Sequence, residues 1–181
     1  DRPRIDYTDS EDGVFLLEKA ATNLQTYSSD LASVYVPTNI TQTSNYGISP
    51  DGSLTSTRVV LANLTDSRSI ETLTLANGAV YTFSCYYKGI IGESTYMSFL
   101  KNPEGVIVSK EIIFTGEWQR ESITFTAGSA SNYTYIVDVR QGVSTATDFE
   151  VWGAQVESGN LSSYIPTQGT IQTRVAETAS G

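Results

Sequence analysis

The sequence predicts an all-β fold, namely an antiparallel β-sandwich with little or no helix. Short runs in which apolar and polar side chains alternate with a period of two recur along the chain. Tight-turn signals such as SPDG at 49–52 and NPEG at 102–105 separate these runs. A helical period is absent, since the best helical stretch, 27–33, would make about two turns at most. Many short strands without intervening helices favour a sandwich over a parallel sheet.

Eight runs have the composition of strands. They are rich in β-branched and aromatic residues, which fit a pleated, half-buried surface, and the chain holds eleven Tyr beside one Met. In chain order the predicted strands are 14–18, 57–62, 79–88, 94–101, 105–114, 118–126, 132–140 and 148–157. Breaks at 76–78 (Ala-Asn-Gly) and 126–128 (Thr-Ala-Gly) support the boundaries of the runs beside them.

Within each strand the alternation assigns side chains to two faces. The predicted inward residues include Tyr81, Phe83, Cys85, Tyr87, Met97, Phe99, Tyr133, Tyr135, Val137 and Val139. Cys85 is then a small buried hydrophobe. Trp152 shares a side with Ala154 and Val156, so we expect it to be buried rather than to contact a ligand. A slip of one residue inverts any such set, so each assignment depends on an unbroken strand.

The opposite faces of these strands collect residues that suit a sugar ligand. Aromatic rings stack on the C–H bonds of a pyranose, while guanidinium and carboxylate groups bind its hydroxyls, and Arg would also suit an acidic sugar. The predicted ligand-binding residues are Tyr86, Lys88, Tyr96, Trp118, Arg120, Asp138 and Arg140. A structural interpretation stays open, because exposed sheet faces commonly carry such residues and Trp118 could cover a sandwich edge.

A structural calcium ion is a second hypothesis. Calcium takes six to eight oxygen ligands, and it often ties the ends of a sandwich together. If the first and last strands are neighbours, Glu18, Asn23, Asp148 and Glu150 could meet and supply carboxylate and amide oxygens. No ligand loop with fixed spacing supports this metal set.

Charge and composition exclude several classes of protein. The net charge is −9, so the chain lacks the excess of basic residues that binding to nucleic acid requires. No run of about 18 apolar residues occurs, so membrane insertion is not expected. The absence of His and the single Cys remove His-based triads, the usual zinc sites and an internal disulfide.

Several segments, in this order, resemble a known family. They are PRIDYTD at 3–9, FLLEKAATNLQTYSSD at 15–30, ISPDGSLTSTRVV at 48–60, VYTFSCYYK at 80–88, GEWQRESITFT at 116–126 and WGAQVESGNLSSYIPTQGT at 152–170. Together they resemble the jelly-roll domains of phage tail and other virion-associated proteins, which are similar to the carbohydrate-binding modules of bacterial polysaccharide-degrading enzymes. The resemblance implies a jelly roll that binds glycans on a concave sheet or at loop edges and often holds calcium.

The resemblance also implies an organisation for the chain. We expect 1–13 to lead in from a longer polypeptide, 14–165 to form the jelly-roll domain, and 166–181 to lead out as a linker. The expected location is extracellular or virion-associated, and the expected partner is a polysaccharide or cell-surface glycan. Oligomerisation of the parent protein stays open.

The leading functional hypothesis is a non-catalytic glycan-binding module of a phage tail protein or polysaccharide-active protein. One alternative is a structural or oligomerising module of a phage fibre or baseplate without a ligand. A glycosidase or polysaccharide lyase is the third hypothesis, but no pair of carboxylates with defined spacing stands out and His is absent. We therefore predict no enzymatic activity.

Overall fold

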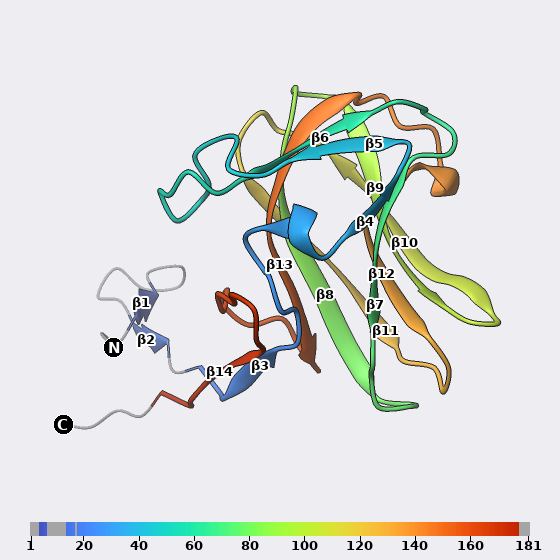
Figure 1. Ribbon diagram of the computed structural model, residues 1–181. Coiled ribbons are helices and arrows are strands. Elements are labelled where there is room, and N and C mark those ends of the chain that lie inside the picture. Colours follow the sequence, from blue (N-terminus) through green and yellow to red (C-terminus); the bar gives the residue numbers. More distant parts are fainter. Residues whose placement is uncertain (1–3, 7–13, 17, 178–181) are drawn as a thin grey trace.

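Two five-stranded antiparallel sheets pack face to face in the computed structural model, which describes residues 4–6, 14–16 and 18–177 (Figure 1). The β9/β12 sheet has the order β10 (Gly105–Ile113), β9 (Ser94–Lys101), β12 (Asn132–Asp138), β7 (Arg68–Leu73) and β4 (Val36–Thr38). The β8/β13 sheet has the order β11 (Gln119–Thr126), β8 (Val80–Lys88), β13 (Asp148–Ser158), β6 (Thr57–Leu61) and β5 (Ile40–Thr43). The predicted all-β antiparallel sandwich is confirmed.

Short elements complete the described structure. β1 (Arg4–Asp6) pairs with β2 (Val14–Leu16), and β3 (Ala21–Asn23) pairs with β14 (Gln172–Arg174). The helical content is limited to the 3₁₀ turns η1 (Leu31–Ser33) and η2 (Val139–Gln141). All eight predicted strands are present, although residue 17, within the first, lies outside the described residues. The sequence pattern missed β1, β3, β4, β5, β7 and β14, which are three to six residues long.

The core lies between the two sheets and consists of their inward-facing side chains. Alternate residues of β8, including Phe83 and Cys85, are fully buried, as the alternation predicted. Phe99 of one sheet stacks on Phe125 of the other, with ring centroids 3.6 Å apart. The Tyr87 hydroxyl donates a hydrogen bond across the core to the carbonyl of Ile136 at 2.9 Å. Apolar burial on both inner faces is the main stabilising contribution in such a sandwich.

Two β-bulges reverse the predicted faces in the last two long strands. In β12 the register shifts between Tyr135 and Val137, and Tyr133 and Tyr135 lie opposite Leu100 and Ser98 of β9, on the outer face. Their predicted inward orientation is therefore wrong, because the extra residue of a bulge inverts the alternation.

The bulge in β13 lies between Trp152 and Gln155, where Gly153 adopts φ +67°. Ala154 and Val156 belong to the core, whereas Trp152 packs on the outer face against Tyr86. Trp152 is nevertheless only 2% exposed, so its predicted burial is confirmed on the opposite side of the sheet.

Segments from both ends of the chain cover the outer face of the β8/β13 sheet. Figure 1 shows β3 and β14 beside β13, away from β10. The Asn23 amide donates to the carbonyls of Ala154 and Ile165, and the Ser28 and Tyr164 hydroxyls are 2.6 Å apart. Packing continues beyond the expected domain boundary at 165, since β14 pairs with β3.

Candidate functional site

The seven predicted ligand residues do not share one face. Four of them belong to the β8/β13 sheet: Tyr86 and Lys88 lie on β8, Arg120 lies on β11, and Trp118 directly precedes β11. The other three belong to the β9/β12 sheet: Tyr96 lies on β9, Asp138 ends β12, and Arg140 lies in η2, which follows β12. The prediction of a single shared surface is wrong, because alternation assigns a side of a strand but says nothing about which sheet the strand joins.

The covered part of the β8/β13 sheet holds Tyr86 and Arg120. Arg120 donates from Nη1 to the carbonyl of Ser162 at 2.7 Å and from Nη2 to Oγ of Ser84 at 3.0 Å. Tyr86 packs edge-on against Trp152 and Tyr164, with centroids 5.4 and 6.3 Å apart. Both predicted ligand residues therefore hold the segment after β13 against the sheet.

The other end of this face is open. A pocket of about 230 Å³ is lined by Tyr46, Lys88, Gly89, Ile90, Asp148, Phe149 and Glu150. Two hydrogen bonds from Arg58 bind Asp148, and the Arg58 guanidinium lies 4.9 Å from the Tyr46 ring centroid. The pKa of Asp148 is lowered by these bonds from Arg58. The carboxylates of this pocket are thus already engaged, since Glu150 accepts a hydrogen bond from Ser56.

Trp118, half-exposed, lies at the edge of the same sheet. Its indole Nε1 donates to the carbonyl of Ile48 at 3.0 Å, which ties the 44–56 loop to the start of β11. This contact corresponds to the structural role that the sequence left open for Trp118.

The structure separates the four residues predicted to bind metal. Glu18 pairs with Arg174 at 2.6 Å, and the Asn23 side chain is bonded to the backbone near Ala154. Asp148 lies six residues before Ala154 on β13, roughly 20 Å away at about 3.3 Å per residue. One ion could not be bound by all four. Within residues 18–177 and the two short N-terminal strands, no group of three or more Asp, Glu, Cys or His could hold a metal ion.

The outer face of the β9/β12 sheet presents a different arrangement, which we call the tyrosine face. It comprises Tyr96, Ser98 and Leu100 of β9, Tyr133, Tyr135 and Asp138 of β12, Arg68, Ile70 and Thr72 of β7, Ser109 and Glu111 of β10, and Arg140 and Gln141 of η2. Tyr96 and Tyr133 are half-exposed, whereas Tyr135 is buried. Ring faces are therefore available to a ligand on two neighbouring strands.

The separation of the two half-exposed rings follows from the register. Tyr133 lies opposite Leu100, which is four residues along β9 from Tyr96. At about 3.3 Å per residue, the two tyrosines are roughly 13 Å apart along the strands. The face is thus long enough for an extended ligand to contact both rings.

A buried carboxylate organises the polar groups between these rings. Asp138 is 0% exposed and accepts hydrogen bonds from Ser98 Oγ at 2.7 Å and Gln141 Nε2 at 3.1 Å. Arg140 donates to it twice, from Nε to Oδ1 at 2.6 Å and from Nη2 to Oδ2 at 3.0 Å. These bonds to Asp138 raise the pKa of Arg140, whose guanidinium also lies 5.1 Å from the Tyr135 ring centroid. A bidentate pair of this kind fixes the guanidinium in one orientation.

Neighbours also fix the Tyr96 ring. Gly142 packs against it so closely that a Cβ at this position would overlap the ring. Partial desolvation and then the Glu111 carboxylate, opposite on β10, raise the pKa of the Tyr96 phenol. Tyr96 is therefore a preorganised, protonated group at one end of the tyrosine face.

The sequence prediction included only Tyr96, Asp138 and Arg140 from this face. It missed Tyr133, Tyr135, Glu111 and Gln141. The one available signal was the adjacent pair Ile136 and Val137, both fully buried, since two consecutive apolar residues in an alternating strand are typical of a bulge.

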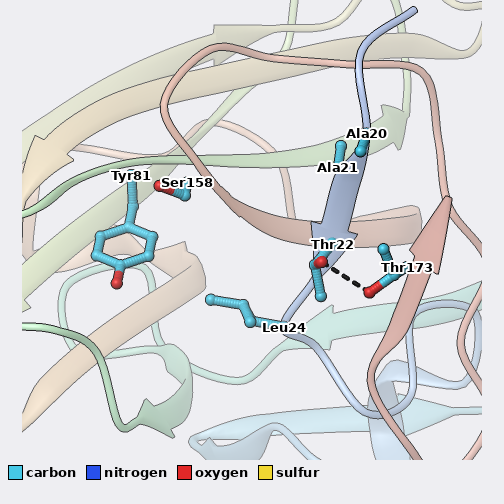
Figure 2. A pocket seen from close by; sticks show the side chains of 7 residues that line it. All are labelled: Ala20, Ala21, Thr22, Leu24, Tyr81, Ser158 and Thr173. Carbon is cyan, nitrogen blue, oxygen red and sulfur yellow. Dashed lines mark hydrogen bonds between the residues drawn. The ribbon is translucent and has the colours of Figure 1, made fainter. Parts of the chain in front are cut away.

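A second pocket lies between the β3–β14 ribbon and the end of the β8/β13 sheet. Figure 2 shows its lining: Ala20, Ala21, Thr22, Leu24, Tyr81, Ser158 and Thr173. The volume is about 310 Å³, and a hydrogen bond of 2.8 Å joins the hydroxyls of Thr22 and Thr173. Methyl and hydroxyl groups dominate this lining, which has no charged side chain, and its single ring belongs to the buried Tyr81. It therefore lacks the exposed ring faces that the tyrosine face offers.

The fold defined by these sheets is the jelly-roll β-sandwich of carbohydrate-binding modules. The chain is similar to the xylan-binding CBM22-1 domain of Paenibacillus barcinonensis Xyn10C, with TM-score 0.55 and 13% identity over 80% of this chain and 99% of that one. It is also similar to the CBM6cm-2 module of Cellvibrio mixtus lichenase 5A in complex with cellotriose, with TM-score 0.53 and 10% identity over 76% and 99% of the two chains.

A third similar structure is the enzymatically active domain of the bacteriophage CBA120 tailspike protein 4. The TM-score is 0.53 at 11% identity, over 75% of this chain and 21% of the tailspike chain. At these identities the likeness concerns the fold. No protein-family description and no curated protein matches the sequence. In the described part of the chain, no helix is long and apolar enough to cross a membrane.

Proposed function

We propose that this protein is a non-catalytic carbohydrate-binding module that binds a glycan chain along the tyrosine face. The observation that carries the proposal is the pair of half-exposed rings, Tyr96 and Tyr133, on either side of the Arg140 and Gln141 donors held by buried Asp138. Rings stack on the C–H faces of sugars, and fixed donors bind their hydroxyl oxygens. Preorganised groups bind with a smaller loss of conformational entropy.

The fold supports this proposal. Two of the structures to which the chain is similar are named as a xylan-binding domain and as a module bound to cellotriose. The outer face of the β8/β13 sheet is partly covered by the chain itself, and its half-exposed rings, Tyr86 and Trp118, are held by Tyr164 and by the carbonyl of Ile48. We therefore place the ligand on the tyrosine face.

A catalytic function has less support. Asp148 and Glu150, which share one face of β13, are separately engaged with Arg58 and Ser56. On the tyrosine face the Asp138 carboxylate is buried and bonded, so Glu111 is the single exposed carboxylate there. Glycoside hydrolysis requires a pair of carboxyl groups flanking the bond.

The parent protein and its location belong to the same proposal. A module that binds polysaccharide acts where polysaccharides are exposed, so we place it in an extracellular or virion-associated protein, as one part of a longer polypeptide. The likeness to a tailspike domain supports a phage tail protein as the parent. The proposal also includes a structural calcium ion, which a comparison of binding with calcium and with chelator would test. The four ligands predicted from the sequence are not part of this proposal.

An alternative function has one specific observation in its favour. Four isoleucines are each more than half exposed: Ile48, Ile90, Ile91 and Ile113. The contact of Gly116 with Ile91 and the bond from Trp118 to Ile48 place the loops that carry Ile48, Ile90 and Ile91 at the end of the sandwich where β10 ends at Ile113. An exposed apolar group of this kind is typical of an assembly surface. A structural or oligomerising module would use this end, whereas a glycan-binding module would use the tyrosine face.

The test is affinity gel electrophoresis against a panel of polysaccharides, with calcium and with chelator. The wild type should be retarded by one polysaccharide class, and Tyr96→Ala and Tyr133→Ala should each weaken binding about tenfold or more, equivalent to about 1.4 kcal/mol. The matched control is Tyr46→Ala, which removes an exposed tyrosine from the 44–56 loop beside the other sheet and should leave binding unchanged. No retardation by any polysaccharide, together with a trimer or dimer by light scattering, would favour the structural module.

A further inference from the structure

We propose that the tyrosine face selects uncharged glycans and rejects those that carry carboxylate or sulfate groups. This inference rests on the proposed function and adds the class of ligand. It departs from the expectation, drawn from the sequence, that the arginines would suit an acidic sugar. The reason is that the cations around the tyrosine face are already paired, while one of its carboxylates is not.

Among the described residues, Arg140 and Arg68 are the cations of the tyrosine face, and the charge of each is compensated. The two hydrogen bonds that Arg140 donates to Asp138 are 2.6 and 3.0 Å long, and Asp138 is fully buried. An anionic sugar would have to compete with this carboxylate for the guanidinium, and a displaced Asp138 would be left buried and unpaired. Arg140 can still donate from Nη1 to a neutral hydroxyl oxygen, because neither bond to Asp138 uses that nitrogen.

Arg68 and the cations around the rim of this face are paired as well. Arg68 binds Asp66 at 2.5 Å, Lys101 lies 3.7 Å from Glu104, and Lys110 lies 2.7 Å from Glu121. Each pair contributes little net potential at the surface, because opposite charges within 4 Å largely cancel at a distance. Among residues 18–177, an approaching anion would therefore meet these cations already paired.

Glu111 is the charged residue of the tyrosine face that has no ion-pair partner among the described residues. It is exposed on β10 opposite Tyr96. A carboxylate at the end of the ligand path repels an anionic sugar and accepts a hydrogen bond from a neutral hydroxyl. The net charge of −9 adds a repulsive field for any polyanion.

The test compares matched polymers that differ in charge. One pair is hydroxyethylcellulose and carboxymethylcellulose, and a second is methyl-esterified pectin and the same pectin after de-esterification. A third pair is whichever polysaccharide retards the wild type, before and after oxidation of its primary hydroxyls to carboxylates. The measurement is made at about 0.15 M salt, where interactions between exposed charges are largely screened beyond about 8 Å. The neutral member of each pair should bind at least tenfold more tightly than its charged partner.

Two variants locate the selectivity. Asp138→Asn leaves Arg140 without its counter-charge, so the preference for the neutral member should fall about tenfold. Glu111→Gln, an exposed substitution that leaves the fold intact, should lower the preference by a smaller factor. Lys19→Gln is the control for a change of one unit of charge far from the tyrosine face, and it should alter nothing.

The outcomes separate this inference from the function on which it rests. Binding of a neutral polymer with loss on oxidation supports both. Tight binding of an acidic polymer, weakened by Tyr133→Ala, overturns the selectivity and leaves the glycan-binding function standing. Binding of neither member of any pair, and of no polysaccharide in the panel, overturns the function itself.

Discussion

Trp152 and Tyr164 pack against each other on the outer face of the β8/β13 sheet, with ring centroids 4.4 Å apart and planes tilted by 48°. The Trp152 indole donates to Oγ1 of Thr55 at 3.1 Å, and burial raises the pKa of Tyr164 to about 12. The two rings therefore form a second apolar cluster, outside the sandwich core, that closes this face with residues from the chain's own loops.

Replacing Trp152 by Ala should destabilise the protein severely. The side chain is almost completely buried between Tyr86 and Tyr164, and truncating a buried Trp typically costs about 3–5 kcal/mol. Urea unfolding monitored by circular dichroism would measure the loss of unfolding free energy. A change below about 1 kcal/mol would show that the cluster contributes little, and the assigned structural role of Trp152 would be wrong.

Trp118→Ala should leave glycan binding intact. Trp118 belongs to the edge of the β8/β13 sheet, opposite the tyrosine face, and its indole is bonded to the 44–56 loop. We expect a stability loss of about 1 kcal/mol, the usual net contribution of one hydrogen bond. Titration calorimetry with the glycan identified in the screen gives the binding result. If binding is lost while the fold is unchanged, the binding site would lie near the loops around Ile48 and not on the tyrosine face.

Gly142→Ala should weaken glycan binding through Tyr96. A Cβ at position 142 overlaps the Tyr96 ring, which must then turn away from its position on the tyrosine face. Binding should fall about tenfold while the unfolding free energy changes by less than about 1 kcal/mol. The check is a double-mutant cycle. If Gly142 acts only by positioning Tyr96, the double variant binds no worse than Tyr96→Ala alone.

Stability should decrease as the pH rises from about 4.5 to about 7, because of Glu71. Glu71 lies opposite Thr134 on the inner side of the β9/β12 sheet, and burial raises its pKa to about 7, against a smaller lowering by the Tyr35 hydroxyl. One of its oxygens and Oε1 of Gln25 are buried without a hydrogen-bond partner. In the unfolded chain the pKa returns to its ordinary 4.5.

The pH range over which stability falls lies between these two pKa values of Glu71. Below pH 4.5 the group is protonated in both states, and between 4.5 and 7 the folded state retains a proton that the unfolded state releases, so stability falls by up to about 3 kcal/mol. Glu71→Gln should remove this loss and stabilise the protein at pH 8 relative to the wild type. Glu117→Gln, an exposed control, should leave the pH profile of urea unfolding unchanged. An identical pH profile in wild type and Glu71→Gln would contradict this account.

The sequence predicted the strands well and the faces unevenly. Alternation and turn residues located β8, β9, β10 and β11 within about two residues, because these strands are long and turn residues bound them; β10 has its bulge near its start, between Val106 and Val108. The bulges in β12 and β13 left weak signals, so Tyr133 and Trp152 were assigned to the wrong sides. Sheet order depends on long-range pairing, such as β12 between β9 and β7, which no local pattern encodes.

The candidate site was predicted in part for the same physical reasons. Tyr96, Asp138 and Arg140 were identified from their chemistry, and the structure brings them to one face. Tyr86 and Arg120 have the same chemistry, yet both are half-exposed and engaged with the segment around Ser162 and Tyr164. Whether a polar sheet face is open or covered depends on where the chain runs after its last strand, and that information lies outside the strand itself.

The most direct test of the central claim is to map the bound glycan on the protein by NMR. An oligosaccharide of the polysaccharide identified in the screen would be titrated into ¹⁵N-labelled protein while backbone and arginine side-chain resonances are followed. The account predicts the largest shifts at Tyr96, Ser98, Tyr133, Arg140 and Gln141, with an Arg140 side-chain signal that responds to binding. Shifts confined to Tyr46, Lys88 and Ile90, beside the pocket on the opposite sheet, would contradict it.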